Sequence, residues 1–369
     1  MKNKLLPRHR ILLLLLVSLV MYLSLWPVPV EPVAWHAPQN AGLIDRFTPN
    51  DVLASARILN LGDHQGPEDI TGGPDALVYA STDAGDIIRF HPDGQELEVF
   101  AHVGGRPLGI EFDAHGNLLV ANAILGLQRV SPAGDVQILL DTINELPLEY
   151  ANDVAVDSEG KIYVSQSTTR FPVQEFGGTY ESSVLDILEH GGSGRVFEFD
   201  LASGDIRVIM DGLNFANGIA VSGDQQFLLV NETAHYRVWR HWLRGPDAGT
   251  SEIILENLPG FPDNLNNGLD EHFWLGLVAP RNEIVDALSD QPFLRKVVQR
   301  LPEFVRPSIE PSSHIVSIDG DGVVLMNLQD SAAHFAAITG AYETRTHLYL
   351  SSLFGNEIAI LDKADLPNQ

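Results

Sequence analysis

Six segments of the chain share one pattern of small, apolar and turn residues, and this internal repeat restricts the possible fold more than any other feature. Five of the six segments begin with a small residue or proline, and in each the first residue is followed by a variable position, an apolar run, a turn and a second apolar run. An outer hairpin such as 195-RVFEFDLASGDIRVIM follows most of them, which gives about four strands per unit at a period of roughly forty residues. The six segments are 67-PEDITGGPDALVYAST, 107-PLGIEFDAHGNLLVAN, 151-ANDVAVDSEGKIYVSQ, 216-ANGIAVSGDQQFLLVN, 262-PDNLNNGLDEHFWLGL and 338-ITGAYETRTHLYLSSL. The repeat predicts an all-β fold, a six-bladed β-propeller over residues 51–369.

The last repeat unit ends at 357-EIAILDKADL and lacks a fourth strand. The segment 55-SARILNLGD, which precedes the first unit, can supply that strand and close the ring. Two spacings between units are long, and the excess falls in residues 168–193 and 279–312. We expect both stretches to be insertions on the loop faces of the propeller, with helical structure in part of the second.

The N-terminus combines positive charge with a long apolar run. Extended to Val30, the run reaches about twenty residues, enough to cross a hydrocarbon core of ~30 Å. The basic residues favour a cytoplasmic N-terminus, with the propeller on the periplasmic, extracytoplasmic or lumenal side. Residues 1–30 are thus predicted to be a basic stub and an uncleaved single-pass signal-anchor helix, and 31–50 a linker. A cleaved signal peptide is the alternative. The stub and the run are made of Lys2, Lys4, Arg8 and Arg10, then 11-ILLLLLVSLVMYLSLW.

Composition excludes several classes of function. The chain has 49 acidic and 23 basic side chains and a net charge of −26. Such a charge repels nucleic acid and anionic lipid, and no basic stripe along the sequence offsets it. The chain has no cysteine, which removes disulfides, thiolate nucleophiles and cysteine-ligated zinc.

The variable position of each unit is the first residue of the expected innermost strand, which faces one mouth of the central channel. Two carboxylates buried together without a counter-charge would repel one another and cost several kcal/mol in desolvation. A divalent cation removes that cost, and carboxylate and amide oxygens favour Ca²⁺ or another hard ion. The six positions hold Glu68, Leu108, Asn152, Asn217, Asp263 and Thr339.

The predicted metal ligands are therefore Glu68, Asn152, Asn217 and Asp263, with Asn264 as a further oxygen donor. A purely local turn is the alternative for Asp263, since Asn and Asp are poor strand formers. Tyr150, two residues before Asn152, is predicted to line a substrate pocket.

A long stretch, 231-NETAHYRVWRHWLRGPDAGTSEIILENLPGFPDNLNNGLDEHFWLG, resembles the strictosidine synthase-like family. The pattern is more distantly similar to gluconolactonases, diisopropyl fluorophosphatase and paraoxonases. The resemblance implies a six-bladed propeller with calcium or another divalent ion in its channel, and membrane-anchored relatives. The ligands of those families match Glu68, Asn152, Asn217 and the pair Asp263–Asn264.

The sequence also departs from these families. Plant strictosidine synthase has a catalytic glutamate where this chain has Thr339, and Glu343 lies four residues on. Paraoxonases have a histidine where this chain has Ala123. The condensation mechanism of strictosidine synthase and the histidine mechanism of paraoxonases therefore cannot be assigned directly to this chain.

Other catalytic signatures are absent from the sequence: there is no Gly-x-Ser-x-Gly, His-Glu-x-x-His or Gly-x-Gly-x-x-Gly. The leading hypothesis is a Ca²⁺-dependent hydrolase of a small-molecule ester or lactone, with Asp263 as general base or nucleophile and Glu343 as a second proton acceptor. A non-enzymatic, membrane-tethered binding or scaffold propeller with a structural calcium is the alternative. A strictosidine synthase-type condensing enzyme ranks below both. The expected partners are the substrate and, through the N-terminal helix, a membrane, and no nucleic acid.

Overall fold

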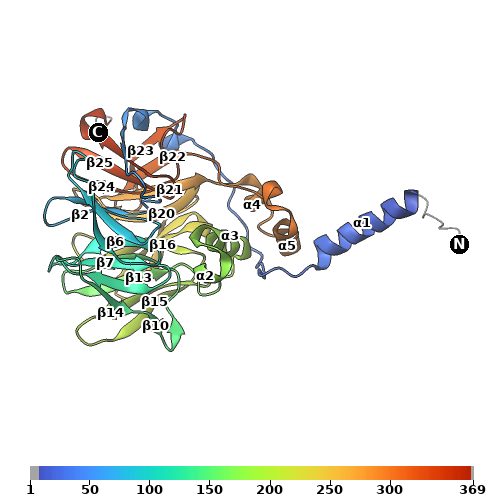
Figure 1. Ribbon diagram of the computed structural model, residues 1–369, viewed down its shortest axis with the longest axis horizontal. Coiled ribbons are helices and arrows are strands. Elements are labelled where there is room, and N and C mark those ends of the chain that lie inside the picture. Colours follow the sequence, from blue (N-terminus) through green and yellow to red (C-terminus); the bar gives the residue numbers. More distant parts are fainter. Residues whose placement is uncertain (1–7, 367–369) are drawn as a thin grey trace.

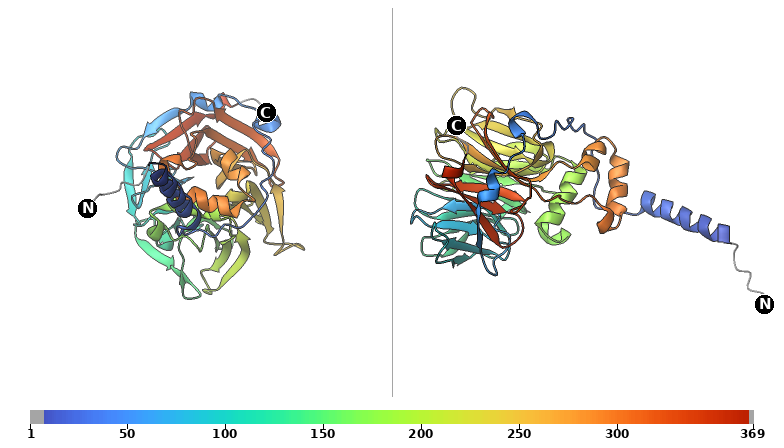
Figure 2. Two further views of the ribbon diagram at one scale, coloured as in Figure 1. Left: turned by 90° about the vertical axis from the view of Figure 1, so that its right-hand side faces the viewer. Right: turned by 90° about the horizontal axis from the view of Figure 1, so that it is seen from above.

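The computed structural model describes residues 8–366, so Lys2 and Lys4 of the expected basic stub lie outside the described residues. Within that range, six four-stranded antiparallel sheets surround a central axis (Figure 2), and one two-stranded hairpin stands apart. This confirms the six-bladed propeller. The blades, in chain order, are β2 (Ile70–Gly72), β3 (Val78–Ser81), β4 (Asp86–Phe90) and β5 (Glu98–His102); β6 (Pro107–Phe112), β7 (Leu118–Asn122), β8 (Gly126–Val130) and β9 (Val136–Leu140); β12 (Ala151–Val156), β13 (Lys161–Gln166), β14 (Gly194–Asp200) and β15 (Ile206–Leu213); β16 (Ala216–Val221), β17 (Phe227–Glu232), β18 (Arg237–Trp242) and β19 (Ser251–Leu255); β20 (Gly260–Asn267), β21 (Phe273–Pro280), β22 (Ser313–Ile318) and β23 (Val324–Asp330); and β24 (Ile338–Glu343), β25 (His347–Ser352), β26 (Glu357–Asp362) and β1 (Arg57–Asn60), with β10 (Thr142–Ile143) and β11 (Leu146–Pro147) forming the hairpin.

The sixth blade is closed by the N-terminal strand, as the sequence predicts. Strand β1 pairs antiparallel with β26, with Arg57 opposite Ile360 and Asn60 opposite Glu357. The ends of the propeller therefore meet in one sheet, in which β1 is the outermost strand.

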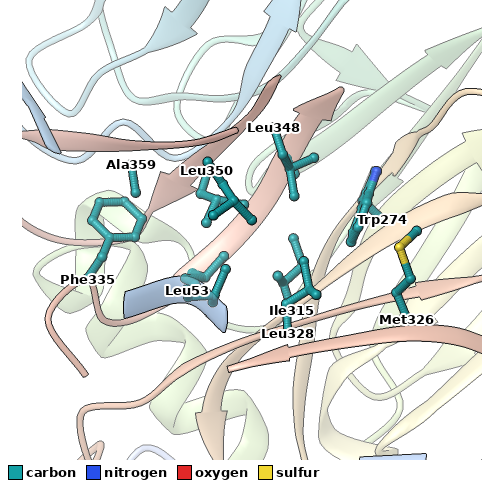
Figure 3. Packing of buried hydrophobic residues seen from close by; sticks show 12 residues of the cluster. Leu53, Trp274, Ile315, Met326, Leu328, Phe335, Leu348, Leu350 and Ala359 are labelled. Carbon is teal, nitrogen blue, oxygen red and sulfur yellow. The ribbon is translucent and has the colours of Figure 1, made fainter. Parts of the chain in front are cut away.

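The core lies between neighbouring blades. Figure 3 shows one such layer, in which Trp274 and Ile315 of the fifth blade face Leu348 and Leu350 of the sixth. Leu53, from the short helix η2 (Val52–Ser55), joins the same layer ahead of β1. Burial of each such apolar side chain contributes about 1.5–3 kcal/mol, so the packing of blade on blade is what holds the ring together.

The inner strands share a local irregularity near the mouth of the channel. The pairing register shifts between Ala151 and Val154, between Ala216 and Ile219, and again after Pro262. A bulge of this kind bends a strand and re-aims a side chain. The repeated bulge falls on the variable positions that the sequence singles out.

Helices cover the mouth of the channel on one face of the ring (Figures 1 and 2). The helical structure expected in residues 279–312 is present, but the insertion at 168–193 is helical as well. Its α3 buries Leu185 and Leu188, so burial of an apolar face accounts for a helix in place of the expected loop. We call these helices the cap. They are α2 (Val173–Phe176), α3 (Thr179–Glu189), α4 (Glu283–Ala287), α5 (Pro292–Arg300) and the 3₁₀ turn η4 (Glu303–Val305).

The remaining helix, α1 (Arg8–Leu25), is exposed along its length and extends away from the propeller (Figure 1). It is long and apolar enough to cross a membrane, in agreement with the expected anchor. Short 3₁₀ turns complete the described elements: η1 (Asp45–Phe47), η3 (Thr233–His235) and η5 (Lys363–Asp365).

The segment after α1 is not a free linker. Residues 26–38, which we call the strap, cross the cap and are hydrogen-bonded to it. The Val33 amide donates to the Glu189 carbonyl over 2.8 Å, and the Trp35 amide donates to the Ser289 carbonyl over 3.1 Å. The Trp35 ring also stacks on His190, with 4.0 Å between ring centroids. The strap therefore joins both insertions to the end of α1.

Candidate functional site

A pocket lies between the mouth of the channel and the cap. Its floor is formed by five of the six variable positions and by Tyr150, and its roof by residues of α3 and α5 such as Ile187 and Val298. The five floor positions are Glu68, Leu108, Asn152, Asn217 and Asp263. The sixth, Thr339, is buried beside them and donates a hydrogen bond to the Glu68 carbonyl. Residues from separate repeats thus meet at one site.

Three buried asparagines are oriented by bonds to their amide nitrogens; Asn152 and Asn217 line the pocket, and Asn264 follows Asp263 in the chain. Asn152 donates to Ser167 Oγ over 2.8 Å, and Asn264 donates to the Glu68 carbonyl over 2.9 Å. Asn217 donates to Thr233 Oγ1 over 3.0 Å. All three amide oxygens are buried and have no hydrogen-bond partner among the described residues. Such unpaired oxygens cost free energy unless something else satisfies them.

The two carboxylates of the floor are buried as well. Glu68 Oε2 has no hydrogen-bond partner within residues 8–366, and burial, Asp263 and Asp69 raise the pKa of Glu68 well above its usual range. Asp263 Oδ1 accepts a 2.6 Å hydrogen bond from Asn217, yet burial raises the pKa of Asp263 to about 7. Together the carboxyl groups of Glu68 and Asp263 form an oxygen-rich site that disfavours the binding of an anion.

Arg106 is a nearby cation that sequence reasoning missed. It is buried, donates to the Gly66 carbonyl over 3.1 Å, and lowers the pKa of Glu68 by its charge. Its place in the repeat, two residues before Leu108, is the signal that could have pointed to it.

The chemistry of these side chains fits a hard cation. No three His, Cys, Asp or Glu side chains of the described chain gather into a metal cluster, so a cation here would depend on amide oxygens as well as carboxylates. We call Glu68, Asn152, Asn217, Asp263 and Asn264 the mouth ring. Its unpaired oxygens match the oxygen-only coordination that Ca²⁺ prefers. The metal-binding role of the mouth ring stays a prediction.

Tyr150 lies where the sequence placed it, in the pocket wall. Its hydroxyl donates to the Thr179 carbonyl of α3 over 2.8 Å. Burial, followed by the charges of Asp263 and Glu68, raises its pKa well above the usual range, so it stays a neutral donor. Its backbone is left-handed, with φ of 53°, a conformation that non-glycine residues adopt at a cost and that often marks functional sites.

Glu343 does not line the pocket; it lies at the far end of β24. The His272 ring nitrogen lies 2.9 Å from its carboxylate, Trp274 Nε1 donates over 3.0 Å, and Lys363 is ion-paired with it. Burial alone would raise the pKa of Glu343, but hydrogen bonds from His272 and Lys363 lower it to about 2. The structure therefore separates Glu343 from the mouth ring, because four residues of extended strand span ~13 Å.

A further set of buried or half-buried polar residues lies one to three positions beyond the mouth ring. We call Asp69, Asp153 and Asn266 the second ring. Each accepts a backbone amide from the next blade, and the three pairs join blades one and two, three and four, and five and six. The donors are Ile110 (2.8 Å, to Asp69), Ile219 (2.7 Å, to Asp153) and Ala341 (2.9 Å, to Asn266). The sequence signal that could have indicated the second ring is an acid or amide at these places in the first, third and fifth repeat units.

Comparison with known proteins places the chain in a family. Residues 45–90 match the N-terminal family of strictosidine synthase-like proteins, and residues 152–246 match the strictosidine synthase family. The adipocyte plasma membrane-associated protein of Bos taurus is 30% identical over 353 residues, which cover 88% of this chain and 82% of that protein.

Solved structures show the same fold at low sequence identity. A gluconolactonase from Xanthomonas campestris superposes with a TM-score of 0.61 at 16% identity, over 92% of this chain and 97% of that one. Regucalcin from Agrobacterium tumefaciens, a calcium-binding protein, superposes with a TM-score of 0.58 at 14% identity, over 83% of this chain and 93% of that one. The sequence matches and the shared propeller agree, and the chain belongs to the strictosidine synthase-like family, which includes the adipocyte plasma membrane-associated proteins.

Proposed function

We propose that this protein is a hydrolase of esters or lactones that depends on Ca²⁺ or a similar divalent cation bound by the mouth ring. The observation that carries the proposal is the set of four buried oxygens without a partner among the described residues, on Glu68, Asn152, Asn217 and Asn264. They surround an acid, Asp263, that lines the same pocket. The gluconolactonase and the calcium-binding regucalcin with the same fold support this reading.

When bound, the cation would polarise the substrate carbonyl and stabilise the negative charge that develops on its oxygen. Asp263 accepts the proton of a water whose oxygen adds to the carbonyl carbon, or its carboxylate attacks that carbon directly. In the first route the ester C–O bond then breaks, and the departing alkoxide takes up the proton. In the second route the same bond breaks as an anhydride forms between the acyl group and Asp263; the alkoxide takes a proton from water, and the remaining hydroxide cleaves the anhydride, which releases the acid and restores the Asp263 carboxylate. The hydrogen bond from Asn217 fixes the Asp263 carboxylate for either route. Tyr150 and the apolar cap residues enclose the substrate, and Glu343 has no part in the reaction.

We further propose that α1 anchors the protein in a membrane as a single span. The basic residues before it orient the N-terminus to the cytoplasm and place the propeller on the opposite side. The names of the curated relatives, which describe membrane-associated proteins, support the anchor.

The test is hydrolysis of aryl esters and lactones by the purified full chain, with and without a chelator. Substitution Asp263→Asn keeps the shape of the side chain but removes the base, and is expected to lower kcat/KM more than about a hundredfold. The matched control Glu343→Gln removes an acid outside the pocket and is expected to retain turnover. Full activity in Asp263→Asn with an intact fold would rule out the assigned role.

One observation favours a second function, binding without turnover. Among the described residues that line the pocket, Glu68 and Asp263 are the acids and there is no histidine. A binding propeller needs the ion for structure but no base. Under this alternative, removing calcium lowers the melting temperature, and a broad panel of esters, lactones and phosphotriesters gives no turnover.

A further inference from the structure

The C-terminal part of the cap, residues 292–306, is basic, although the cap as a whole is acidic. Residues 292–306 hold four basic residues and one acidic residue, a local charge of +3 (4 − 1) in a chain of −26. Three of the four, Arg295, Arg300 and Arg306, form no ion pair with any described carboxylate. Instead their guanidinium groups donate to backbone carbonyls, as Arg306 does to Gln299 over 2.8 Å. Arg295 and Arg300 are themselves buried, so their guanidinium groups bind the cap to the strap instead of facing solvent.

The same segment exposes large apolar side chains. Phe304 of η4 is 90% exposed, and Phe293 of α5 is 56% exposed. Ile284, Leu294 and Val305 are also exposed. Exposed aromatic and aliphatic groups beside basic residues are typical of segments that lie in the interface of a lipid bilayer.

The cap is also fixed to the end of α1. Arg300 donates to the carbonyls of Trp26 over 2.6 Å and Leu23 over 2.9 Å, and the Tyr22 hydroxyl donates to the Arg300 carbonyl over 3.0 Å. Figures 1 and 2 show α4 and α5 on the side of the propeller from which α1 leaves. A bilayer that contains α1 would therefore begin next to α5.

From these observations we propose that the segment 284–305 of the cap docks on the bilayer that holds α1, with Phe293 and Phe304 inserted among the lipids. This proposal rests on α1 being the membrane anchor. Residues 284–305 hold three basic and three acidic residues, so this docking depends on apolar contact and not on attraction to charged headgroups. The pocket shares Val285 and Val298 with this segment, so its mouth would open at the lipid surface. If the proposed hydrolase function also holds, its substrates are amphiphilic esters or lactones that concentrate there.

The absence of cysteine from the sequence makes a direct test simple. The full chain carrying Phe304→Cys is labelled with an environment-sensitive fluorophore and reconstituted in vesicles of zwitterionic and anionic phospholipid. Substitution at so exposed a position does not disturb the fold. The matched control, Ala202→Cys, lies in the exposed turn between β14 and β15, at the ends of those strands remote from the cap. Phe293→Cys provides a second position on the docking segment.

Labels at 304 and 293 are expected to shift to shorter emission wavelengths and to be quenched severalfold more by spin-labelled lipid than the label at 202. Equal access of all three labels to an aqueous quencher would overturn the proposal. So would shielding at 304 that depends on the ratio of protein to lipid, because it would show that a second copy of the chain covers the segment. The measurement requires no turnover, so its failure is distinct from failure of the hydrolase proposal.

Discussion

The mouth ring and the second ring lie on the same inner strands, and neighbouring residues in them behave in opposite ways. Asn152 leaves its amide oxygen without a partner among the described residues. Asp153, the next residue, has both carboxylate oxygens bonded to backbone amides, from Val154 over 2.8 Å and Ile219 over 2.7 Å. Successive residues of a strand point to opposite faces, so one polar residue can face the pocket while its neighbour bonds to the next blade.

The difference teaches how to separate a binding site from structural polarity in a buried channel. Asp69, Asp153 and Asn266 hold blades together and have their side-chain polar atoms bonded within the protein. Groups that form a binding site are fixed by a hydrogen bond at one atom and leave a second polar atom without a partner. Four predictions test that distinction, in order of the expected change in unfolding free energy.

The largest effect is expected where the inner strands approach most closely. A Cβ added to Gly218 would lie 2.2 Å from the backbone nitrogen of Leu265 in the next blade. The substitution Gly218→Ala should therefore lower the free energy of unfolding by more than about 3 kcal/mol. Gly223→Ala is the control, because no atom lies within 4 Å of its added Cβ. Urea unfolding of the two variants in detergent measures the difference between their free energies of unfolding. Equal stability would mean that the inner strands of neighbouring blades are not closely packed at Gly218.

The next effect separates the two rings directly. Asp153→Ala leaves the Val154 and Ile219 amides unbonded in the interior, which should cost about 3 kcal/mol of unfolding free energy. Asn152→Ala loses one hydrogen bond, to Ser167, and should cost about 1 kcal/mol but weaken the thermal stabilisation produced by calcium. If Asn152→Ala were the more destabilising of the pair and responded normally to calcium, the assignment of the rings would be reversed.

Calcium itself should stabilise the native protein through the mouth ring. Ligand at a hundred times its dissociation constant adds about 2.7 kcal/mol to the free energy of unfolding. Glu68→Gln removes one of the two carboxylates and should abolish most of this gain. Melting curves with calcium and with chelator measure both proteins. A wild-type curve that does not move with calcium would contradict the proposed ion site.

The smallest effect concerns Glu343, whose pKa of about 2 lies below the ordinary value of 4.5. A lowered folded-state pKa means that Glu343 stabilises the protein above pH 4.5, and that this contribution is lost as the pH falls toward 2. Glu343→Gln should therefore be about 1–2 kcal/mol less stable at pH 7 and lose less stability between pH 4.5 and 2. Urea unfolding at several pH values tests this, and a loss of hydrolysis with unchanged stability would restore a catalytic role to Glu343.

The repeat made much of this architecture predictable. A unit with a fixed register specifies which residue of each copy faces the mouth, so Glu68, Asn152, Asn217 and Asp263 could be grouped before any coordinates. The closure of the ring by 55-SARILNLGD followed from the same count of strands. That Glu343 lies outside the pocket lining could not be read from the sequence, because proximity along the sequence says little about distance within an extended strand.

Features outside the repeat could not be predicted in the same way. The cap helix α3 lies in an insertion without periodic constraint. The strap has no regular secondary structure, and its position depends on side chains such as Arg281, which donates to the Pro38 carbonyl from more than two hundred residues away. Contacts of that kind leave no pattern in a single sequence.

The strap has a mechanical consequence. Because α1 leads through it into Leu53 and β1, the path from α1 to the outer strand of the sixth blade is a continuous chain of about thirty residues. Tension on α1 would load the bonds that Arg300 and Arg295 make to Trp26 and Val33 of the strap before it reached the pairing of β1 with β26. The contacts between cap and strap therefore precede the closure of the ring on the path along which a pull on α1 would act.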